Sequence, residues 1–228
     1  IAPSLVRATT YYVSNSGNDS NAGTSSTAPW KTITKVNTLS STLLPGDQVL
    51  FQRGGTFRGT ININCSGSSS QFITLGAYGT GAAPIISGSS LVTSWTAYSG
   101  NIYRAQVGQL VTQVFVGGTR QTLARYPNTG WLRNDNASTT SLYDNALTQS
   151  ANHWTGATVV IRSANWCYEI PVVSGFSGGT LSFPAITTNM GTLNWGYFLC
   201  NKLSELDQAG EWFYESTSGY LYLWAPGS

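Results

Sequence analysis

Four carboxylates cluster near the C-terminal end of the sequence, at Glu205, Asp207, Glu211 and Glu215. Most glycosidases use two carboxyl groups, roughly 5 to 10 Å apart, one as an acid and the other as a base or nucleophile. Residues 211 and 215 would share one face of an extended strand, about 13 Å apart at the rise of a strand. That distance is too long for a retaining pair and generous for an inverting one. Asp207 lies in an expected turn, where Asp often bonds its own backbone, so structural roles are favoured for these acids.

Histidine and metal chemistry have little support in the sequence. His153 is the sole histidine, and it lacks the accompanying Ser, Cys or carboxylate motif that a triad or a metal site requires. A loop or surface role is favoured for it. Between Asn15 and Thr24, Asp19 stands among many oxygen-bearing side chains that could bind calcium. Because this loop holds one carboxylate and lacks the EF-hand spacing, a network of Asx turns is favoured, and we expect no metal and no cofactor.

The last hairpin offers a candidate ligand surface. Residues 211–215 and 220–224 are expected strands that flank a four-residue loop. Pairing across this loop creates an apolar face, formed by Trp212, Tyr214, Leu221 and Leu223. The opposite face carries Glu211, Glu215 and an aromatic row formed by Phe213, Tyr220, Tyr222 and Trp224. Phe213, Tyr222 and Trp224 are candidates for carbohydrate binding, since the apolar faces of sugars stack on aromatic rings. Packing against the neighbouring solenoid, with the acids at the edge, is the favoured alternative.

The three cysteines, Cys65, Cys167 and Cys200, are an odd number, so at least one thiol stays unpaired within the chain. None has the Cys-x-x-Cys spacing of a zinc or redox motif. Cys167 and Cys200 both lie in the second half beside aromatic strands, and they are the best candidates for a disulfide. The alternative is that they are free, since buried cysteine also serves as a small hydrophobic residue.

The composition indicates an extracellular all-β protein. Only 9% of the residues are charged, against about a quarter in an average protein, and Ser, Thr, Asn and Gly take their place. A net charge of +2 without a basic cluster argues against a nucleic-acid partner. No apolar run approaches the ~20 residues that span a bilayer, so no membrane insertion is expected.

The N-terminal part has an ordered succession of elements. Residues 11–13 are an expected strand, followed by a polar loop. Pro29 suits the first turn of a helix, and the apolar spacing predicts a short helix over Trp30 to Leu43. Pro45-Gly46-Asp47 ends it, and Val49 to Phe51 begin a strand. A Gly-Gly corner then leads to a further strand near Thr56.

Two stretches resemble a known family. YYVSNSGNDSNAGT, APWKTITKV and GDQVLFQRGGTFRG are similar to the opening of bacterial right-handed parallel β-helix proteins of the pectate-lyase-like kind. The resemblance implies that the helix caps the open end of a solenoid and that GDQVLFQRGGTFRG is its first coil. YFLCNKLSELDQAGEWFYESTSGYLYLWAPGS resembles the segment with which many secreted β-helix proteins return from an antiparallel insertion. The superfamily includes lyases, hydrolases and adhesins, so the resemblance specifies architecture rather than chemistry.

A second module is expected after about residue 90. Gly117-Gly118 is a strong hairpin signal, and antiparallel hairpins do not belong inside a parallel solenoid. We therefore divide the chain into residues 1–90, the arm, capping helix and first coils, and residues 91–228, an antiparallel β-sandwich-like module. Within it, Arg125-Tyr126-Pro127 resembles a motif in inserted domains of β-helix glycosidases, which implies that Arg125 and Tyr126 contact carbohydrate. An arginine that bonds loop carbonyls is the favoured alternative.

Two functional hypotheses follow from these observations. In the first, the chain is the N-terminal portion of a secreted polysaccharide-active β-helix enzyme, a glycoside hydrolase or polysaccharide lyase. Its catalytic residues would then lie in later coils beyond Ser228, and the segment itself would be inactive. In the second, it is a non-catalytic cell-surface, adhesive or glycan-binding module of a larger extracellular assembly. We favour the first, since APGS is an abrupt end for a β-helix. Val6-Arg7-Ala8 indicates either a signal-peptidase site or an ordinary N-terminal arm.

Overall fold

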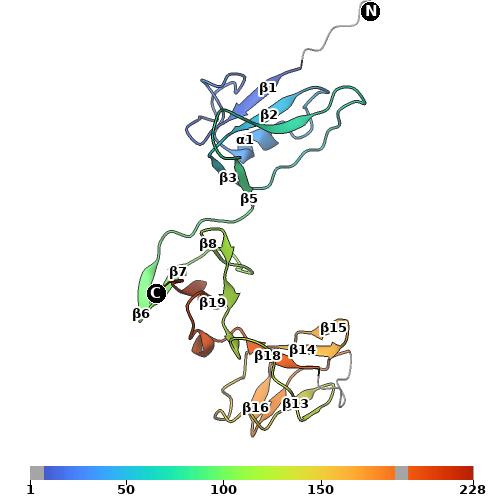
Figure 1. Ribbon diagram of the computed structural model, residues 1–228, viewed down its shortest axis with the longest axis vertical. Helices are drawn as coiled ribbons and strands as arrows, with labels where there is room; N and C mark the ends of the chain where they lie inside the picture. The colour runs from blue at the N-terminus through green and yellow to red at the C-terminus, as the bar shows by residue number, and fades with distance from the viewer. Residues whose placement is uncertain (1–7, 188–194, 228) are drawn as a thin grey trace, which may run out of the picture. The chain divides into compact units, whose positions relative to one another are not determined.

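The structure of the protein is a computed structural model that describes residues 8–187 and 195–227. Its contacts divide the chain into two compact units, one ending at Leu91 and the other beginning at Val92 (Figure 1). The chain is all-β, as the sequence predicts: its described helical segments are only α1 (Ile33–Asn37) and the 3-10 turn η1 (Leu203–Glu205). Most of the Val6-Arg7-Ala8 motif lies outside the described residues.

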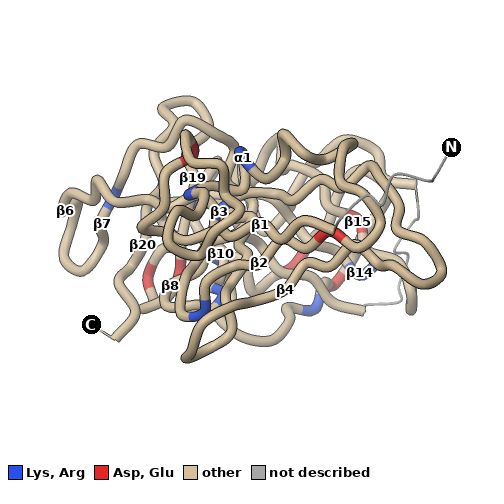
Figure 2. The backbone as a smooth tube through the Cα atoms, turned by 90° about the horizontal axis from the view of Figure 1, so that it is seen from above, with Lys and Arg blue, Asp and Glu red and all other residues tan. Residues whose placement is uncertain are grey.

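Charged residues are few and spread along the chain (Figure 2). Within the described part of the chain, no helix has the length and hydrophobicity needed to cross a bilayer.

The first unit is built from parallel strands. β2 (Gln48–Gln52) lies between β1 (Thr10–Val13) and β4 (Thr74–Tyr78), and both pair with it in parallel. β3 (Thr56–Arg58) and β5 (Ile85–Ser87) form a second parallel pair. Each parallel neighbour must be reached by a crossover connection rather than a tight hairpin, so the chain advances from one sheet to the other and back.

The helix is shorter than expected. The apolar spacing predicts a helix over residues 30–43, whereas α1 has five residues. The side chain of Thr32 caps its N-terminus by accepting a hydrogen bond from the Lys35 backbone N–H. Beyond Asn37 the chain continues as hydrogen-bonded turns. At the helix end the Thr38 hydroxyl donates to the Lys35 carbonyl at 2.7 Å, and Thr side chains of this kind compete for helical backbone groups.

One buried cluster holds the first unit together. Its members come from α1, β1, β2, β3 and the segment around α1: Val13, Trp30, Ile33, Val36, Leu43, Val49, Phe51 and Phe57. Trp30 stacks on Tyr11, with ring centroids 4.9 Å apart. Gly23 has a φ of 76°, and a Cβ at this position would overlap the Trp30 indole. The loop therefore requires glycine where it crosses the ring.

Asp19 fastens the polar loop to the start of the helix. Its carboxylate accepts hydrogen bonds from the Lys31 and Thr32 backbone N–H groups, at 2.7 and 3.0 Å, and from the Thr32 hydroxyl at 2.7 Å. Burial would raise the pKa of Asp19, but these hydrogen bonds outweigh it and lower the pKa. The Asp19 oxygen atoms thus hold the backbone at the start of the helix by hydrogen bonds, which is a structural role, as the sequence favours.

The second unit contains three larger sheets and a small hairpin, β8–β9. A five-stranded sheet has the order β10-β19-β20-β7-β6, with β10 at Thr122–Leu123, β19 at Glu211–Glu215, β20 at Tyr220–Trp224, β7 at Ile102–Gln106 and β6 at Thr96–Ser99. A four-stranded sheet has the order β11-β18-β14-β15, at Arg125–Tyr126, Tyr197–Cys200, Thr158–Ala164 and Cys167–Glu169. The other four-stranded sheet has the order β12-β13-β17-β16, at Asn136–Ala137, Ser141–Tyr143, Thr180–Ser182 and Gly175–Ser177. The hairpin pairs Phe115–Val116 with Thr119–Arg120.

Only part of the second unit is a sandwich. The two four-stranded sheets share one core, to which the first contributes Val159, Ile161, Tyr197 and Leu199 and the second Leu142, Phe176 and Leu181. The five-stranded sheet has separate clusters on its two faces. The single large sandwich expected from the sequence is therefore replaced by a smaller sandwich and a separate sheet. The polar stretch at residues 128–150 contains the short strands β12 and β13.

The predicted Cys167–Cys200 disulfide is wrong, because all three cysteines are free thiols. β14 lies between the strands that carry the two residues. Cys200 pairs with Thr158 and Cys167 with Ala164, so the partners are six residues apart along β14, or about 20 Å. A disulfide requires Cα atoms within about 7 Å, and the register excludes it.

Candidate functional site

The last hairpin has the two faces that the sequence predicts. Trp212 pairs with Leu223, and Tyr214 with Leu221, so these four side chains lie on one face. They pack with Val114 in a buried cluster, which confirms this face as core. The Trp212 indole N–H donates to the Gln121 backbone carbonyl at 3.3 Å and fixes the ring against the neighbouring strand.

The aromatic face is mostly covered by residues of the same unit. Tyr222 is buried, while Phe213 and Trp224 are half-buried. All three pack in one cluster with Leu203 and Leu206, from η1 and the residue that follows it. These aromatic side chains thus pack against η1 of their own unit. Tyr222 and Trp224 do not form an open platform for a sugar.

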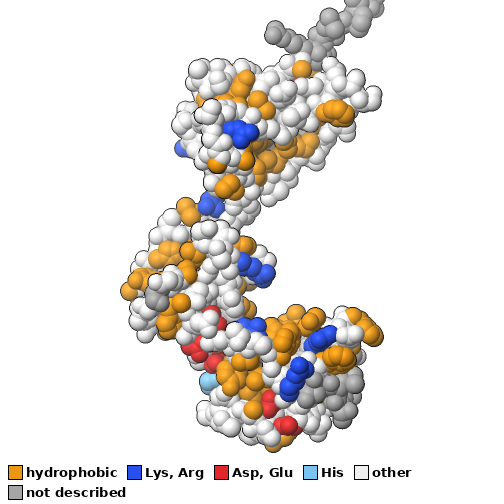
Figure 3. All heavy atoms as spheres, viewed as in Figure 1, with side chains coloured by type: hydrophobic (Ala, Val, Ile, Leu, Met, Phe, Trp, Pro, Cys, Tyr) orange, Lys and Arg blue, Asp and Glu red, His pale blue; other side chains and the backbone are white. Residues whose placement is uncertain are grey.

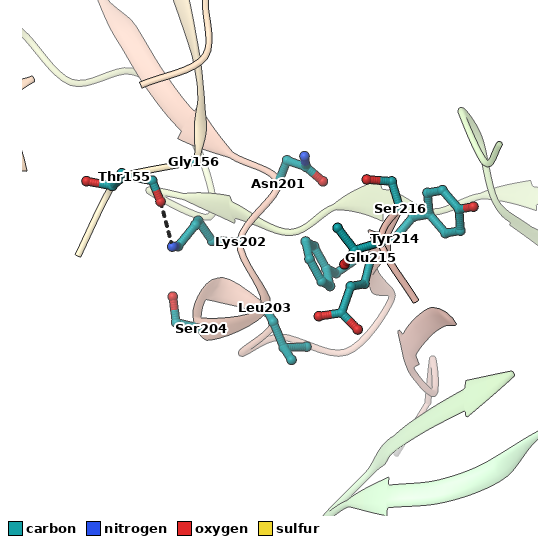
Figure 4. Close-up of a pocket in the computed structure, with 11 residues that line it drawn as sticks. Thr155, Gly156, Asn201, Lys202, Leu203, Ser204, Tyr214, Glu215 and Ser216 are labelled. Carbon is teal, nitrogen blue, oxygen red and sulfur yellow. Dashed lines mark hydrogen bonds between the residues drawn. The ribbon is translucent and has the colours of Figure 1, made fainter. Parts of the chain in front are cut away.

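Phe213 reaches a pocket of about 430 Å³ beside this cover (Figure 4). The pocket lies between the turn at residues 155–156, the segment 201–204 and the end of β19 with its loop, residues 213–217. Its polar wall carries Lys202, Ser204, Glu215 and Ser216. Hydroxyl, ammonium and carboxylate groups in one small pocket are the groups that hydrogen-bond a polyhydroxylated ligand.

The charged groups of the pocket are already held in place. The Lys202 ammonium donates to the Thr155 carbonyl at 3.0 Å and is directed away from Glu215 (Figure 4). Glu215 accepts hydrogen bonds from the Ser218 hydroxyl and, at 3.5 Å, from the Tyr222 hydroxyl. These contacts hold Lys202 and Glu215 in place and do not pair the Glu215 carboxylate with a second acid.

The sequence indicated no carboxylate partner for His153, but the structure places one beside it. Its Nε2 atom lies 3.0 Å from Glu205 Oε1, and Ser204 also donates to Glu205 at 2.8 Å. Together with the bond from Lys202 to Thr155, this contact joins the loop at residues 153–155 to the segment at residues 202–205. The partners are 52 residues apart in sequence, and no local signal could have revealed the pair.

The four candidate acids occupy separate environments. Glu205 faces His153, and Asp207 accepts a hydrogen bond from the Asn128 amide at 2.9 Å. Glu211 is 2% exposed, and burial raises its pKa to about 7. Its carboxylate accepts a hydrogen bond from the Asp207 backbone N–H at 3.3 Å. Because Glu211 is buried and Glu215 lies at the pocket, they do not flank one solvent-accessible site.

Arg125 and Tyr126 have structural partners. Arg125 donates from Nε to the Pro127 carbonyl at 2.9 Å and from Nη2 to the Gly130 carbonyl at 2.6 Å. This is the loop-carbonyl alternative that the sequence analysis favours. Tyr126 packs against the core of the sandwich, with its ring 5.4 Å from that of Trp154. The peptide bond from Tyr126 to Pro127 is cis.

The described residues contain no cluster of three or more His, Cys, Asp or Glu side chains able to hold a metal ion.

Comparison with known proteins gives the class to which this architecture corresponds. No family model matches the chain. A solved glycoside hydrolase superposes on 97% of this chain and 44% of its own, with a TM-score of 0.74 and 17% sequence identity. The chain therefore shares its fold with part of that protein.

Part of the chain is similar in sequence to lacto-N-biosidases. A lacto-N-biosidase of Bifidobacterium longum subsp. longum is 43% identical over 105 residues, which are 44% of this chain and 6% of that protein. A GH136 lacto-N-biosidase from Eubacterium ramulus is 44% identical over 33% of this chain and 12% of its own, with a TM-score of 0.31. The chain is thus related to carbohydrate-active enzymes, and it spans less than half the length of each of these proteins.

Proposed function

We propose that the chain is the N-terminal portion of a longer secreted β-helix protein of the glycoside hydrolase class, and that this portion does not carry the catalytic carboxylates. The observation that supports the class most directly is the 43% identity to a lacto-N-biosidase over 105 residues. An oligosaccharide is accordingly the proposed substrate of the longer protein.

The open edges of the first unit support the β-helix part of this proposal. Among the described residues, β4 and β5 each pair on one side only. Large apolar side chains are exposed on or beside these strands: Phe72, Leu75, Ile85 and Ile86. Phe72 and Leu75 also line a mainly apolar pocket of about 510 Å³. An unpaired edge next to exposed apolar surface is unfavourable in water, and a further coil added in parallel would cover both.

The environments of the acids support a non-catalytic role for this portion. General acid–base catalysis needs a proton donor and an acceptor within reach of the same bond. Glu211 is buried, Glu205 is paired with His153, and Glu215 accepts hydrogen bonds from neighbouring hydroxyls. The pocket at Glu215 is better suited to holding sugar hydroxyl groups than to cleaving a glycosidic bond.

The test compares the 228-residue chain with the longer product of its gene. Both are assayed on lacto-N-biose-terminated oligosaccharides and on a panel of xylan, pectin and fucan, with released sugars quantified by chromatography. We expect turnover from the longer protein and none from the 228-residue chain. Turnover by the short chain that Glu215→Gln abolishes would contradict the non-catalytic role. A longer protein that releases no sugar from any substrate would contradict the assignment to glycoside hydrolases.

A further inference from the structure

The sheet β11-β18-β14-β15 has one buried face and one outward face. Its register places Phe198 opposite Val160, and Tyr168 opposite Arg162. Directly paired residues of antiparallel strands point to the same side, so these side chains project away from the core. The alternate positions, Val159, Ile161, Tyr197 and Leu199, fill the sandwich core instead. The strand pattern therefore leaves aromatic and basic groups on the outside.

Trp131 completes an aromatic surface on this side. Its ring lies 5.0 Å from Phe198 in an edge-on contact and 6.0 Å from Tyr168 in a tilted one. Trp131 is 40% exposed and Tyr168 is 52% exposed, although both are held by ring contacts. We call Trp131, Tyr168 and Phe198, with Arg125 and Arg162, the outer aromatic face. Figure 3 shows hydrophobic and basic side chains gathered over these strands.

The two arginines give this face a positive charge. Arg125 lies over the Phe198 ring at 3.9 Å and donates to backbone carbonyls. Arg162 donates from Nη2 to the backbone and side-chain oxygens of Asn165, at 3.0 and 2.6 Å. Its Nε atom is buried and has no hydrogen-bond partner. Within the described residues, neither guanidinium forms an ion pair with a carboxylate.

We propose that the outer aromatic face binds a saccharide that carries a carboxylate. Exposed aromatic rings fixed by their neighbours present flat apolar surfaces at little entropic cost, and the C–H face of a pyranose ring can stack on Trp131 and Tyr168. Arg162 lies on the same side of the sheet as these rings, so its positive charge would attract the acid group of such a sugar. The inference rests on the proposed function only for its choice of carbohydrate as the ligand class.

Trp166 provides a matched control for the stacking residues. It lies in the turn between β14 and β15 and is 85% exposed, more than Trp131. It has no part in the ring contacts that define the outer aromatic face. If general hydrophobic adhesion caused binding, Trp166 would contribute at least as much as Trp131.

The experiment measures binding of oligogalacturonate to the 228-residue chain by isothermal titration calorimetry. A neutral oligosaccharide and a sulfated one of equal length serve as comparison ligands. We expect Trp131→Ala and Arg162→Gln each to weaken oligogalacturonate binding at least tenfold, and Trp166→Ala to change it less than twofold. Trp131→Phe, which retains a ring, is expected to keep most of the affinity. The neutral ligand should bind at least fivefold more weakly than oligogalacturonate.

Several results would overturn the inference. The first is that oligogalacturonate does not bind, and the second is that the neutral ligand binds equally well or the sulfated ligand binds more tightly. The third is that Trp131→Ala and Trp166→Ala lose equal affinity for oligogalacturonate. Concentration-dependent self-association that Trp131→Ala abolishes, without saccharide binding, would make the face an interface between copies. Circular dichroism establishes that each variant is folded. Hydrolysis by the longer protein carrying Trp131→Ala tests the proposed function separately, because that proposal places the catalytic carboxylates outside this portion of the chain.

Discussion

Replacing Tyr197 by phenylalanine tests the central polar contact of the sandwich core. Tyr197 and Asp144 are both buried, and the phenol donates to Asp144 Oδ2 at 2.6 Å. Burial and this hydrogen bond raise the pKa of Tyr197, so the phenol remains a donor throughout the physiological range. The substitution removes only the hydroxyl and leaves the ring in place.

The size of the effect follows from what Asp144 retains. Its Oδ1 atom still accepts from the Ala146 backbone N–H at 2.8 Å, but Oδ2 loses the Tyr197 hydroxyl. A hydrogen bond to a charged group contributes about 1.5 to 3 kcal/mol. We therefore expect Tyr197→Phe to lower the free energy of unfolding by about 2 kcal/mol. Asp144→Asn keeps an acceptor, so its cost should be nearer 1 kcal/mol, within the usual range for a neutral hydrogen bond.

Urea unfolding followed by tryptophan fluorescence measures these changes. Wild type, both single variants and the double variant form a cycle in which the interaction free energy should be about 1 kcal/mol or more. Tyr143→Phe is the control: Tyr143 ends β13, directly before Asp144, and is 40% exposed, so this substitution should change stability by less than about 0.5 kcal/mol. A Tyr197→Phe effect as small as the control, or strict additivity in the cycle, would refute the reasoning.

Three further predictions concern other parts of the chain. The pKa of Glu211 is raised from 4.5 to about 7, so the folded state binds this proton more tightly than the unfolded state. The resulting contribution to the free energy of unfolding is fully present below pH 4.5 and is lost as the pH rises through 7. This loss should amount to about 3 kcal/mol. Glu211→Gln should remove that slope in unfolding curves measured from pH 4 to 8, and an unchanged slope would count against it. Thr32→Ala removes the cap of α1 and a donor to Asp19, so thermal unfolding should show a loss of about 1 to 2 kcal/mol; no loss would show that the cap is dispensable. A thiol reagent in denaturant without reductant should titrate three cysteines, and a count of one would restore the disulfide.

Local patterns in the sequence were enough to predict the last hairpin. Its strands alternate apolar and polar-aromatic residues, and a four-residue loop sets the register, so Trp212 meets Leu223 as expected. Thr32 and the turns after α1 show the opposite case. The apolar spacing extends to Leu43, but hydroxyl side chains end the helix earlier. Periodicity identifies which face is buried better than it identifies where an element stops.

The site was harder to predict because its parts come from distant segments. Glu205 and His153 meet only because the segment after β18 passes the loop before β14. The same applies to Trp131, which joins Phe198 and Tyr168 although neither is near it in sequence. The disulfide prediction failed for a related reason. Cys167 and Cys200 both lie in aromatic strands, but this does not reveal which residues of the intervening strand β14 each of them pairs with.

The path of the chain between the two cores of the second unit has a consequence for how this fold can vary. The chain leaves the five-stranded sheet at Ala124 and returns at Asn201, whose backbone N–H donates to the Ala124 carbonyl at 3.0 Å. Arg125 and Cys200 face each other in the next ladder position. The sandwich is thus an insertion whose two ends lie side by side, a geometry that tolerates insertion and removal of whole domains. Evolution can lengthen, exchange or delete the sandwich without changing the strand order of the sheet that carries it.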